Sequence, residues 1–166
     1  MIPLLFSEVR VTTVADTPVL LLREAAGSRQ LAVWIGAAGG HAILSALEPP
    51  AEEHPTAHDV LLDALSVLGA VVEEVRITGV TDGVYSAELS VKGNAVPCRV
   101  SDGVALALRG GAQILVADEV LQAVGLDLVA APPEATLLDG DTVQMERFRA
   151  FLDTITPEDF TGEEKP

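Results

Sequence analysis

Apolar and polar positions in the first 35 residues follow the pattern of short strands. Residues 7–14 alternate polar and apolar side chains, which is typical of a half-buried strand. The run from Val19 to Leu22 is continuously apolar and fits a strand that is covered on both faces. After a turn at Gly27-Ser28, residues 30–35 give a third such segment. Because these connections are short, we expect a meander of three antiparallel strands.

Two helices are predicted to follow this meander. Gly36 opens a helix over residues 37–47, which Pro49-Pro50 stops because proline cannot continue a helix. Thr56 is a natural N-cap for the second helix, and Asp59 stands three residues later at capping-box spacing. This second helix should present one apolar face and end before Gly69; the face consists of Leu61, Leu65 and Leu68.

A hairpin and a further short strand are predicted for the middle of the chain. Residues 71–78 and 84–92 have the composition of strands, and Asp82-Gly83 between them is a strong hairpin signal. Gly93-Asn94 then turns the chain into a short strand over residues 95–99.

A helix, a strand and a last short helix complete the expected domain. Ser101 is the candidate N-cap of a helix that runs to about residue 109 and ends at Gly110-Gly111. Residues 113–116 form a short strand, and Asp118 is expected to cap a final helix that ends at Gly125.

The fold class predicted from these elements is α+β. We expect one compact domain over residues 1–126, with a mixed or antiparallel sheet and three or four short helices. Residues 127–140 contain two turn-forming pairs and are interpreted as a linker. Residues 141–160 have helical spacing and form a C-terminal appendage, whereas residues 161–166 are expected to be a disordered tail.

The charge of the chain limits the partners that can be expected. Ten Lys and Arg residues face 25 Asp and Glu residues, which gives a formal net charge of −15. Proteins that bind nucleic acid gain much of their affinity from basic side chains that neutralise phosphates. Nucleic acid is therefore a possible partner that the net charge disfavours, unless a local basic site, a metal ion or an oligomer gathers positive charge.

Composition also predicts where the protein works. The sequence has no apolar run of the roughly 18 to 20 residues that a membrane-spanning helix needs. The N-terminal residues lack the basic and small-residue features of a signal peptide. Cys98 is the single cysteine, so no disulfide can form within the chain, and we expect it to be buried in a strand. A cytoplasmic protein with no membrane partner is the expectation.

Three segments resemble the bacterial bifunctional nuclease family. Residues 31–36 (Leu-Ala-Val-Trp-Ile-Gly) are the first. Residues 54–60 (His-Pro-Thr-Ala-His-Asp-Val) look like the family's Arg-Pro-x-Thr-His-Asp-Leu motif. Residues 99–109 are similar to its Arg-Pro-Ser-Asp-Ala-x-Ala-Leu-Ala-x-Arg motif. The resemblance extends in the same order over nearly the whole chain and implies an α+β domain, usually a homodimer, with nuclease activity on DNA and RNA.

The chain departs from the family pattern at several polar positions, as a divergent member would. Gly39-Gly40 stands where the family has Glu-Ala, so a carboxylate is missing. His54 replaces an arginine, Ala57 replaces a threonine and Val100 replaces a proline. An alternative function therefore accompanies the nuclease: a homo-oligomeric scaffold or a small-ligand-binding member of the same fold, without catalysis.

The nuclease hypothesis assigns catalytic roles to His58, Asp59 and Asp102. Phosphodiester hydrolysis needs an activated water and stabilisation of charge on the phosphate oxygens. His58 is a candidate general base, and Asp59 with Asp102 could hold Mg²⁺ or Mn²⁺ if the two helix starts meet. The structural alternatives are that Asp59 closes a capping box and that Asp102 complements the helix dipole.

The same hypothesis makes Ser101, Arg99 and Arg109 the substrate-binding residues. Ser101 could bind a phosphate at the start of its helix, and the two arginines could clamp one. Alternatively, Ser101 only caps the helix and each arginine pairs with a surface carboxylate. For Arg99, an ion pair with the nearby Asp102 is the favoured interpretation. Trp34 is expected to be a core residue and not a base-stacking platform.

Overall fold

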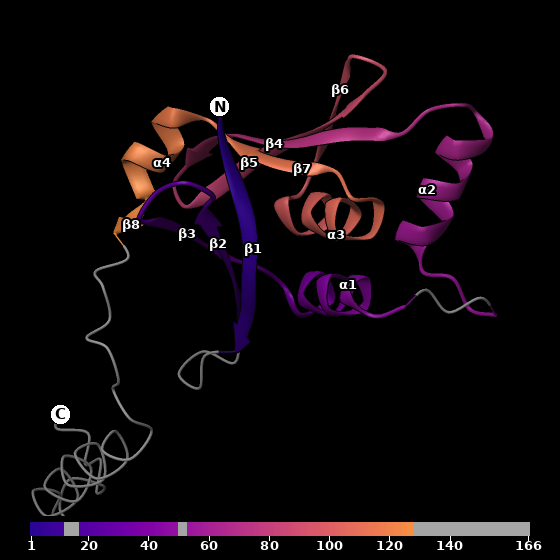
Figure 1. Cartoon of the computed structure of the whole chain (residues 1–166). Helices are drawn as coiled ribbons and strands as arrows, with labels where there is room; N and C mark the ends of the chain where they lie inside the picture. Colours follow the sequence, from indigo (N-terminus) through magenta and orange to yellow (C-terminus); the bar gives the residue numbers. More distant parts are fainter. Residues whose placement is uncertain (12–16, 50–52, 128–166) are drawn as a thin grey trace, which may run out of the picture. The chain divides into compact units, whose positions relative to one another are not determined.

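The computed structural model describes residues 1–11, 17–49 and 53–127 (Figure 1). They lie within one compact unit, Met1–Leu128. The predicted appendage over residues 141–160, most of the linker and the tail lie outside the described residues. No helix among those described is long and apolar enough to cross a membrane.

One sheet forms the framework of this unit. Its strand order is β6-β5-β4-β7-β1-β2-β3-β8, and β4 pairs with β7 in parallel while the other neighbours are antiparallel. The sheet is therefore mixed, and the predicted meander β1-β2-β3 is confirmed. The strands are β1 Ile2–Val11, β2 Pro18–Glu24, β3 Arg29–Trp34, β4 Val72–Thr81, β5 Val84–Val91, β6 Asn94–Cys98, β7 Gln113–Val116 and β8 Leu126–Asp127.

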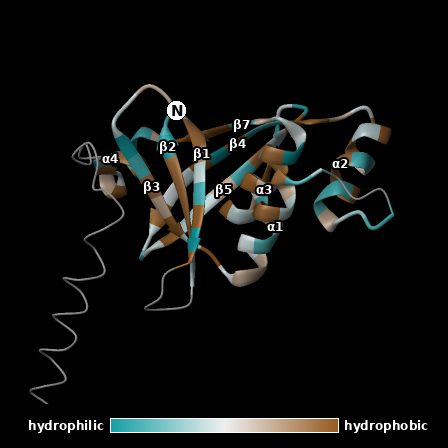
Figure 2. Cartoon of the chain, turned by 60° about the horizontal axis from the view of Figure 1, so that its bottom comes forward, coloured by the Kyte–Doolittle hydropathy of each residue, from teal (hydrophilic) through white to brown (hydrophobic). Residues whose placement is uncertain are grey.

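Four helices accompany the sheet in the described part of the chain, which confirms the α+β class. They are α1 Ala37–Leu47, α2 Ala57–Val67, α3 Val100–Gly110 and α4 Asp118–Val124. α1 and α3 lie side by side, and α3 packs against β4 and β5 (Figures 1 and 2). α2 packs chiefly against α3 at one end of the unit.

The core is built from aliphatic side chains. Burying them supplies the main driving force for folding, at about 25 cal/mol per Å² of apolar surface. α3 is the most deeply placed helix, with seven of its residues buried. The largest fully buried side chains are Leu20, Leu22, Leu31, Ile43, Ile77, Leu121, Val75, Val104 and Val116.

Small residues set how closely α3 approaches its neighbours. A Cβ atom added at Gly103 would lie 2.7 Å from a methyl carbon of Val75 on β4. A Cβ atom added at Gly39 of α1 would lie 2.7 Å from both Cβ and Oγ of Ser101. Because real Cβ atoms do not approach this closely, glycine at these two positions lets α3 pack tightly on the sheet and on α1.

The hairpin turns carry the expected left-handed backbone. Asp82 and Gly83 have φ angles of 50° and 78°, which confirms the predicted turn between β4 and β5. The turn between β5 and β6 uses Lys92 and Gly93, with φ angles of 49° and 72°, one residue earlier than predicted. Asn94, predicted as a turn residue, is instead the first residue of β6.

Two predicted burial patterns are wrong. Trp34 is 60% exposed, because Leu31, Val33 and Ile35 take the inward positions at this end of β3 and alternation points Trp34 outward. In α2, Leu61 and Leu68 are exposed, while Leu62 and Leu65 pack against the core. The leucines chosen from spacing alone therefore did not define the buried face. Cys98 is partly buried at the end of β6.

The helix starts are partly as predicted. Thr56 and Asp59 form the expected capping box of α2. Ser101 is not an N-cap, because α3 begins earlier, with Arg99 as the capping residue. Asp118 is not a cap either: it is the first residue of α4, and Ala117 precedes it as the cap. Neither of these two caps uses a side-chain hydrogen bond.

Gly39→Ala should destabilise the fold through the contact between α1 and α3. The added methyl group would overlap the Ser101 side chain, and overpacking of this kind costs roughly 1 to 3 kcal/mol. This exceeds the gain in helix propensity of under about 1 kcal/mol. Urea unfolding followed by circular dichroism measures the difference. Gly40→Ala, inside the same helix, is the matched control, because the nearest atom would lie 3.3 Å from its added Cβ; equal stability of the two variants would refute the packing argument.

Candidate functional site

The first turn of α2 lies against α3 and brings together three of the predicted site residues. Nε2 of His58 is 3.6 Å from Oδ1 of Asp102. Arg99 holds the same carboxylate with two hydrogen bonds, from Nε to Oδ2 at 2.7 Å and from Nη2 to Oδ1 at 3.1 Å. We refer to His58, Asp102 and Arg99 as the histidine–aspartate cluster. The favoured ion pair of Arg99 with Asp102 is thus present.

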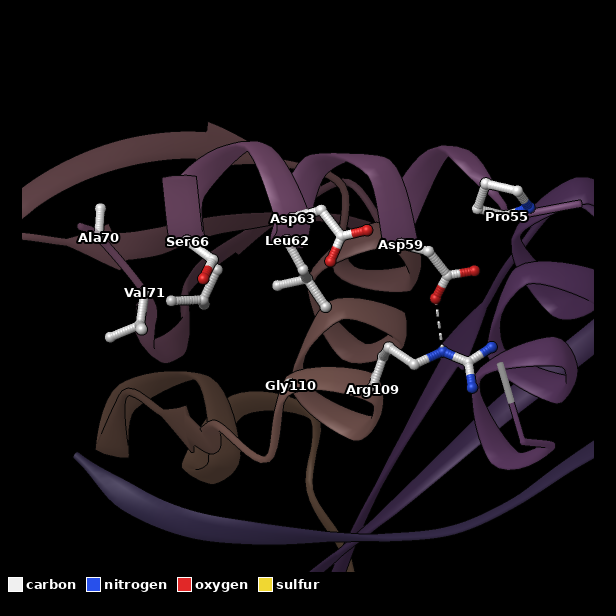
Figure 3. A pocket seen from close by; sticks show the side chains of 10 residues that line it. Pro55, Asp59, Leu62, Asp63, Ser66, Ala70, Val71, Arg109 and Gly110 are labelled. Carbon is white, nitrogen blue, oxygen red and sulfur yellow. Dashed lines mark ion pairs between the residues drawn. The ribbon is translucent and has the colours of Figure 1, made fainter. Parts of the chain in front are cut away.

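Asp59 belongs to a separate arrangement. Thr56 donates hydrogen bonds from its amide and hydroxyl to Oδ2 of Asp59, at 2.8 and 2.7 Å, and accepts one from the Asp59 amide at 3.3 Å. Oδ1 of Asp59 lies 2.8 Å from Nε of Arg109 (Figure 3). The hydrogen bonds from Thr56, assisted by the charge of Arg109, hold the pKa of Asp59 below its usual value.

Arg109 joins three helices through its guanidinium group. Besides the ion pair with Asp59 of α2, its Nη2 donates to the Ser45 carbonyl oxygen of α1 at 2.7 Å, and Nη1 donates to the Glu48 carbonyl oxygen. The side chain is only 12% exposed. Nη1 and Nη2 donate hydrogen bonds to these carbonyl oxygens, whereas Nε is in ion-pair contact with Asp59 without forming a hydrogen bond. The phosphate-clamping role expected for Arg109 stays a prediction, and a structural role is what the contacts describe.

The carboxylates of Asp59 and Asp102 therefore pair with different arginines, Arg109 and Arg99, at opposite ends of α3. Asp102 is in the first turn and Arg109 in the last, a separation of about 10 Å along the axis for seven residues. His58 points to the first turn and its neighbour Asp59 to the last, since adjacent residues on a helix face different ways. The two helix starts converge, but each acid has its own partner.

The donor set does not fit a divalent ion shared by Asp59 and Asp102 as these side chains are arranged. Each of the four carboxylate oxygens of Asp59 and Asp102 already contacts an arginine or a threonine. Within residues 1–11, 17–49 and 53–127 there is no group of three or more His, Cys, Asp and Glu side chains that could hold a metal. Binding of Mg²⁺ or Mn²⁺ stays a prediction, and no step argued below depends on it.

A cavity of about 570 Å³ lies between α2 and α3 and was not foreseen from the sequence (Figure 3). Asp59, Leu62, Asp63 and Ser66 line it from α2, and Arg109 lies opposite them. The spacing of the α2 residues at i, i+3, i+4 and i+7 was a signal that they share one face. The ion pair of Asp59 and Arg109 forms part of the polar lining of this cavity, together with Asp63 and Ser66, and the wall also contains apolar side chains.

Comparison with known proteins finds matches that span most of the described part of the chain. A family model described as the bifunctional nuclease domain matches residues 20–128, which include both helix starts. Two uncharacterized proteins of Mycobacterium tuberculosis, from strains CDC 1551 and H37Rv, are each 38% identical over 156 residues. The aligned region covers 92% of this chain and 93% of each relative.

Asp59→Asn should lower stability and flatten its dependence on acid pH. The variant weakens the capping box and leaves Arg109 without its charged partner, a loss of roughly 2 to 4 kcal/mol. Because the folded-state pKa of Asp59 lies below the usual 3.8, its contribution to stability is complete only above about pH 5. It disappears as the pH falls through the lowered value.

Unfolding free energies of both proteins between pH 7 and pH 3 test this sign. The gap between them should be constant near neutrality and shrink at the acid end. Asp63→Asn, on the same face of α2, is the matched control and should change stability little. A gap that widens towards acid pH would contradict the assignment.

Proposed function

The chain belongs to the bifunctional nuclease domain family, and on that premise we propose that it hydrolyses phosphodiester bonds of DNA or RNA at the histidine–aspartate cluster. The observation that supports this site is the 3.6 Å approach of His58 to Asp102 beside the guanidinium of Arg99. The imidazole and the guanidinium both contact the same carboxylate. This combination suits general acid–base catalysis on a phosphate ester.

The chemistry assigns one role to each residue. Asp102 orients the imidazole through Nε2, so Nδ1 of His58 is the nitrogen that accepts a proton from a water molecule. The water oxygen attacks phosphorus, the bond from phosphorus to the leaving oxygen breaks, and the proton returns to that oxygen. Arg99 stabilises charge on the phosphate with donors that Asp102 does not occupy, since Nη1 takes no part in the hydrogen bonds to Asp102.

A net charge of −15 limits how the substrate is held. A long polyanion would be repelled by most of such a surface, so affinity must come from the local charge of Arg99 and the positive end of α3. Cleavage of short or single-stranded substrates at low ionic strength fits this arrangement better than tight binding to duplex DNA.

His58→Gln and Asp102→Asn should each reduce cleavage by about 100-fold or more, because the first removes the proposed base and the second removes the charge that orients it. The substrates are single-stranded RNA and supercoiled plasmid, each incubated with Mg²⁺, with Mn²⁺ and with EDTA. Loss of activity in EDTA alone would support the predicted metal. His41→Gln, an exposed histidine on α1, is the matched control and should retain activity.

Absence of cleavage by the folded protein under all of these conditions would remove the proposal. Equal activity of the His58→Gln variant and the unchanged protein would move the chemistry away from this cluster.

A second candidate function is a homodimeric scaffold without catalysis, and the surface of α2 favours it. Helix α2 has Asp59 as its one buried residue, whereas Val67 is 87% and Leu68 is 72% exposed. Val60, Leu61 and Val71 add further exposed apolar surface on and beside this helix. Contiguous apolar surface of this kind is uncommon on monomers and is typical of an interface. A second copy of the chain is the partner that we propose.

Val67→Glu combined with Leu68→Glu should convert a dimer to a monomer, because two charges would be buried against an apolar partner. Light scattering after size-exclusion chromatography measures the mass in solution. Val96→Glu, an exposed change on β6, is the matched control and should leave the dimer intact. A monomeric unchanged protein at concentrations in the tens of micromolar would exclude this candidate.

A further inference from the structure

A second cavity, of about 330 Å³, lies where the starts of α1 and α3 meet the ends of β3, β5 and β6. It is separate from the cavity between α2 and α3, and the two share no lining residue. The lining residues used below are Trp34, Gly36, Gly39, Tyr85, Arg99 and Ser101.

Two helix N-termini open into this cavity with their amides uncapped by side chains. The N-cap residues Gly36 of α1 and Arg99 of α3 make no side-chain capping hydrogen bond. The first intrahelical hydrogen bonds run from the Gly40 amide to the Gly36 carbonyl oxygen and from the Gly103 amide to the Arg99 carbonyl oxygen. The three amides before Gly40 and the three before Gly103 therefore have no partner within their own helix. Donors of this kind, at the positive ends of two 11-residue helices, suit an anion.

The Ser101 hydroxyl is an independent sign of a ligand. Ser101 is only 6% exposed and lines the cavity, yet its side chain has no hydrogen-bond partner among the described residues. Its oxygen keeps contact with solvent, since it is not among the fully buried polar atoms that lack a partner, so the hydroxyl is available to a ligand in the cavity. Its oxygen faces Gly39 of α1, where a Cβ atom would come within 2.7 Å. Gly39 thus lets the two helix starts lie in close contact at this part of the cavity wall.

The charged part of the cavity lining is a cation. Arg99 is the charged side chain among the described residues that line it, and no carboxylate belongs to that lining. Asp102 binds Nε and Nη2 of Arg99, whereas Nη1 has no partner within the described part of the chain. In a protein of net charge −15, this is a local site for negative charge.

The mouth of the cavity carries an exposed indole ring. Trp34 is 60% exposed although it is the largest apolar side chain of β3. Tyr85 on β5 lines the same cavity and is fixed by the hydrogen bond that its hydroxyl donates to the Ala32 carbonyl oxygen at 3.1 Å. An exposed indole next to an anion site can stack on a nucleobase, since every base presents a π face.

We propose that this cavity binds a nucleotide, with its phosphate between the two helix starts and the Ser101 hydroxyl and with its base against Trp34. The volume lies at the lower end of the roughly 300 to 1,000 Å³ that small-ligand sites occupy. Backbone amides supply the donors, so the site does not require the lysines that a long polyanion would demand. Arg99 lines this cavity and also belongs to the histidine–aspartate cluster, so the inference rests in part on the proposed function. It goes beyond that function because binding of a nucleotide needs no hydrolysis.

Intrinsic fluorescence gives a direct test, because Trp34 is the only tryptophan in the sequence. Adenosine 5′-monophosphate should quench it in a saturable way, adenosine should bind at least about tenfold more weakly, and inorganic phosphate should compete without quenching. The second probe is a 5′-phosphorylated single-stranded RNA octamer. If it binds as tightly as the mononucleotide, the site recognises the 5′ end of a strand. Weaker binding of the octamer identifies a free nucleotide.

Variants separate the site from general effects on folding. Gly36→Asp places a good N-cap and a negative charge at the start of α1 in open space, so stability should hold while nucleotide affinity falls by about tenfold or more. Gly36→Ala should retain binding. Ser101→Ala should weaken binding by about tenfold, and Ser66→Ala in the other cavity should not change it.

Thermal unfolding followed by circular dichroism confirms that each variant is folded, and calorimetry replaces fluorescence for Trp34→Ala. No saturable binding up to millimolar nucleotide, or binding that is unaffected by Gly36→Asp and Ser101→Ala, would overturn the inference. Failure of cleavage with intact nucleotide binding would remove the proposed nuclease function and leave this site standing.

Discussion

The buried guanidinium of Arg109 is the interaction on which the arrangement of helices depends. It contacts the last carbonyl oxygens of α1 and the carboxylate at the start of α2, while it belongs to the last turn of α3. Asp59 is the one buried residue of α2, and Leu62 and Leu65, which pack against the core, are only partly buried. The chain therefore uses a carboxylate and an arginine, rather than apolar contact alone, to hold the α2 start where His58 reaches Asp102.

The close approach of α1 to α3 is the second constraint, and it changes which chemistry the fold can offer. Gly39 has no side chain, and the Ser101 side chain lies against that position. A larger residue at Gly39 would force the helices apart. Glycine at this position thus goes together with tight packing and with two adjacent helix starts, whose first backbone amides are polar groups there.

The sequence predicts most elements because local signals decide them. The capping box at Thr56 and Asp59 and the hairpin at Asp82-Gly83 are set by neighbouring residues, and the structure has both. Ser101 was assigned as a cap because serine favours that position, but α3 begins two residues earlier and buries it. Trp34 was predicted to lie in the core because its side chain is apolar. In the structure, the alternation of side chains along β3 points it outward instead. The contacts of Arg109 span more than 60 residues and leave no local pattern.

Negative charge on this protein is compatible with anion recognition because the acids near the helix starts are already paired. Asp59 is held by Thr56 and Arg109, and Asp102 by Arg99, so neither presents an uncompensated charge to its surroundings. Excess acid elsewhere on the surface is screened over about 8 to 10 Å at physiological salt, whereas helix amides act at contact distance. The sign of the local field is thus set by the ends of α1 and α3 and not by the total charge.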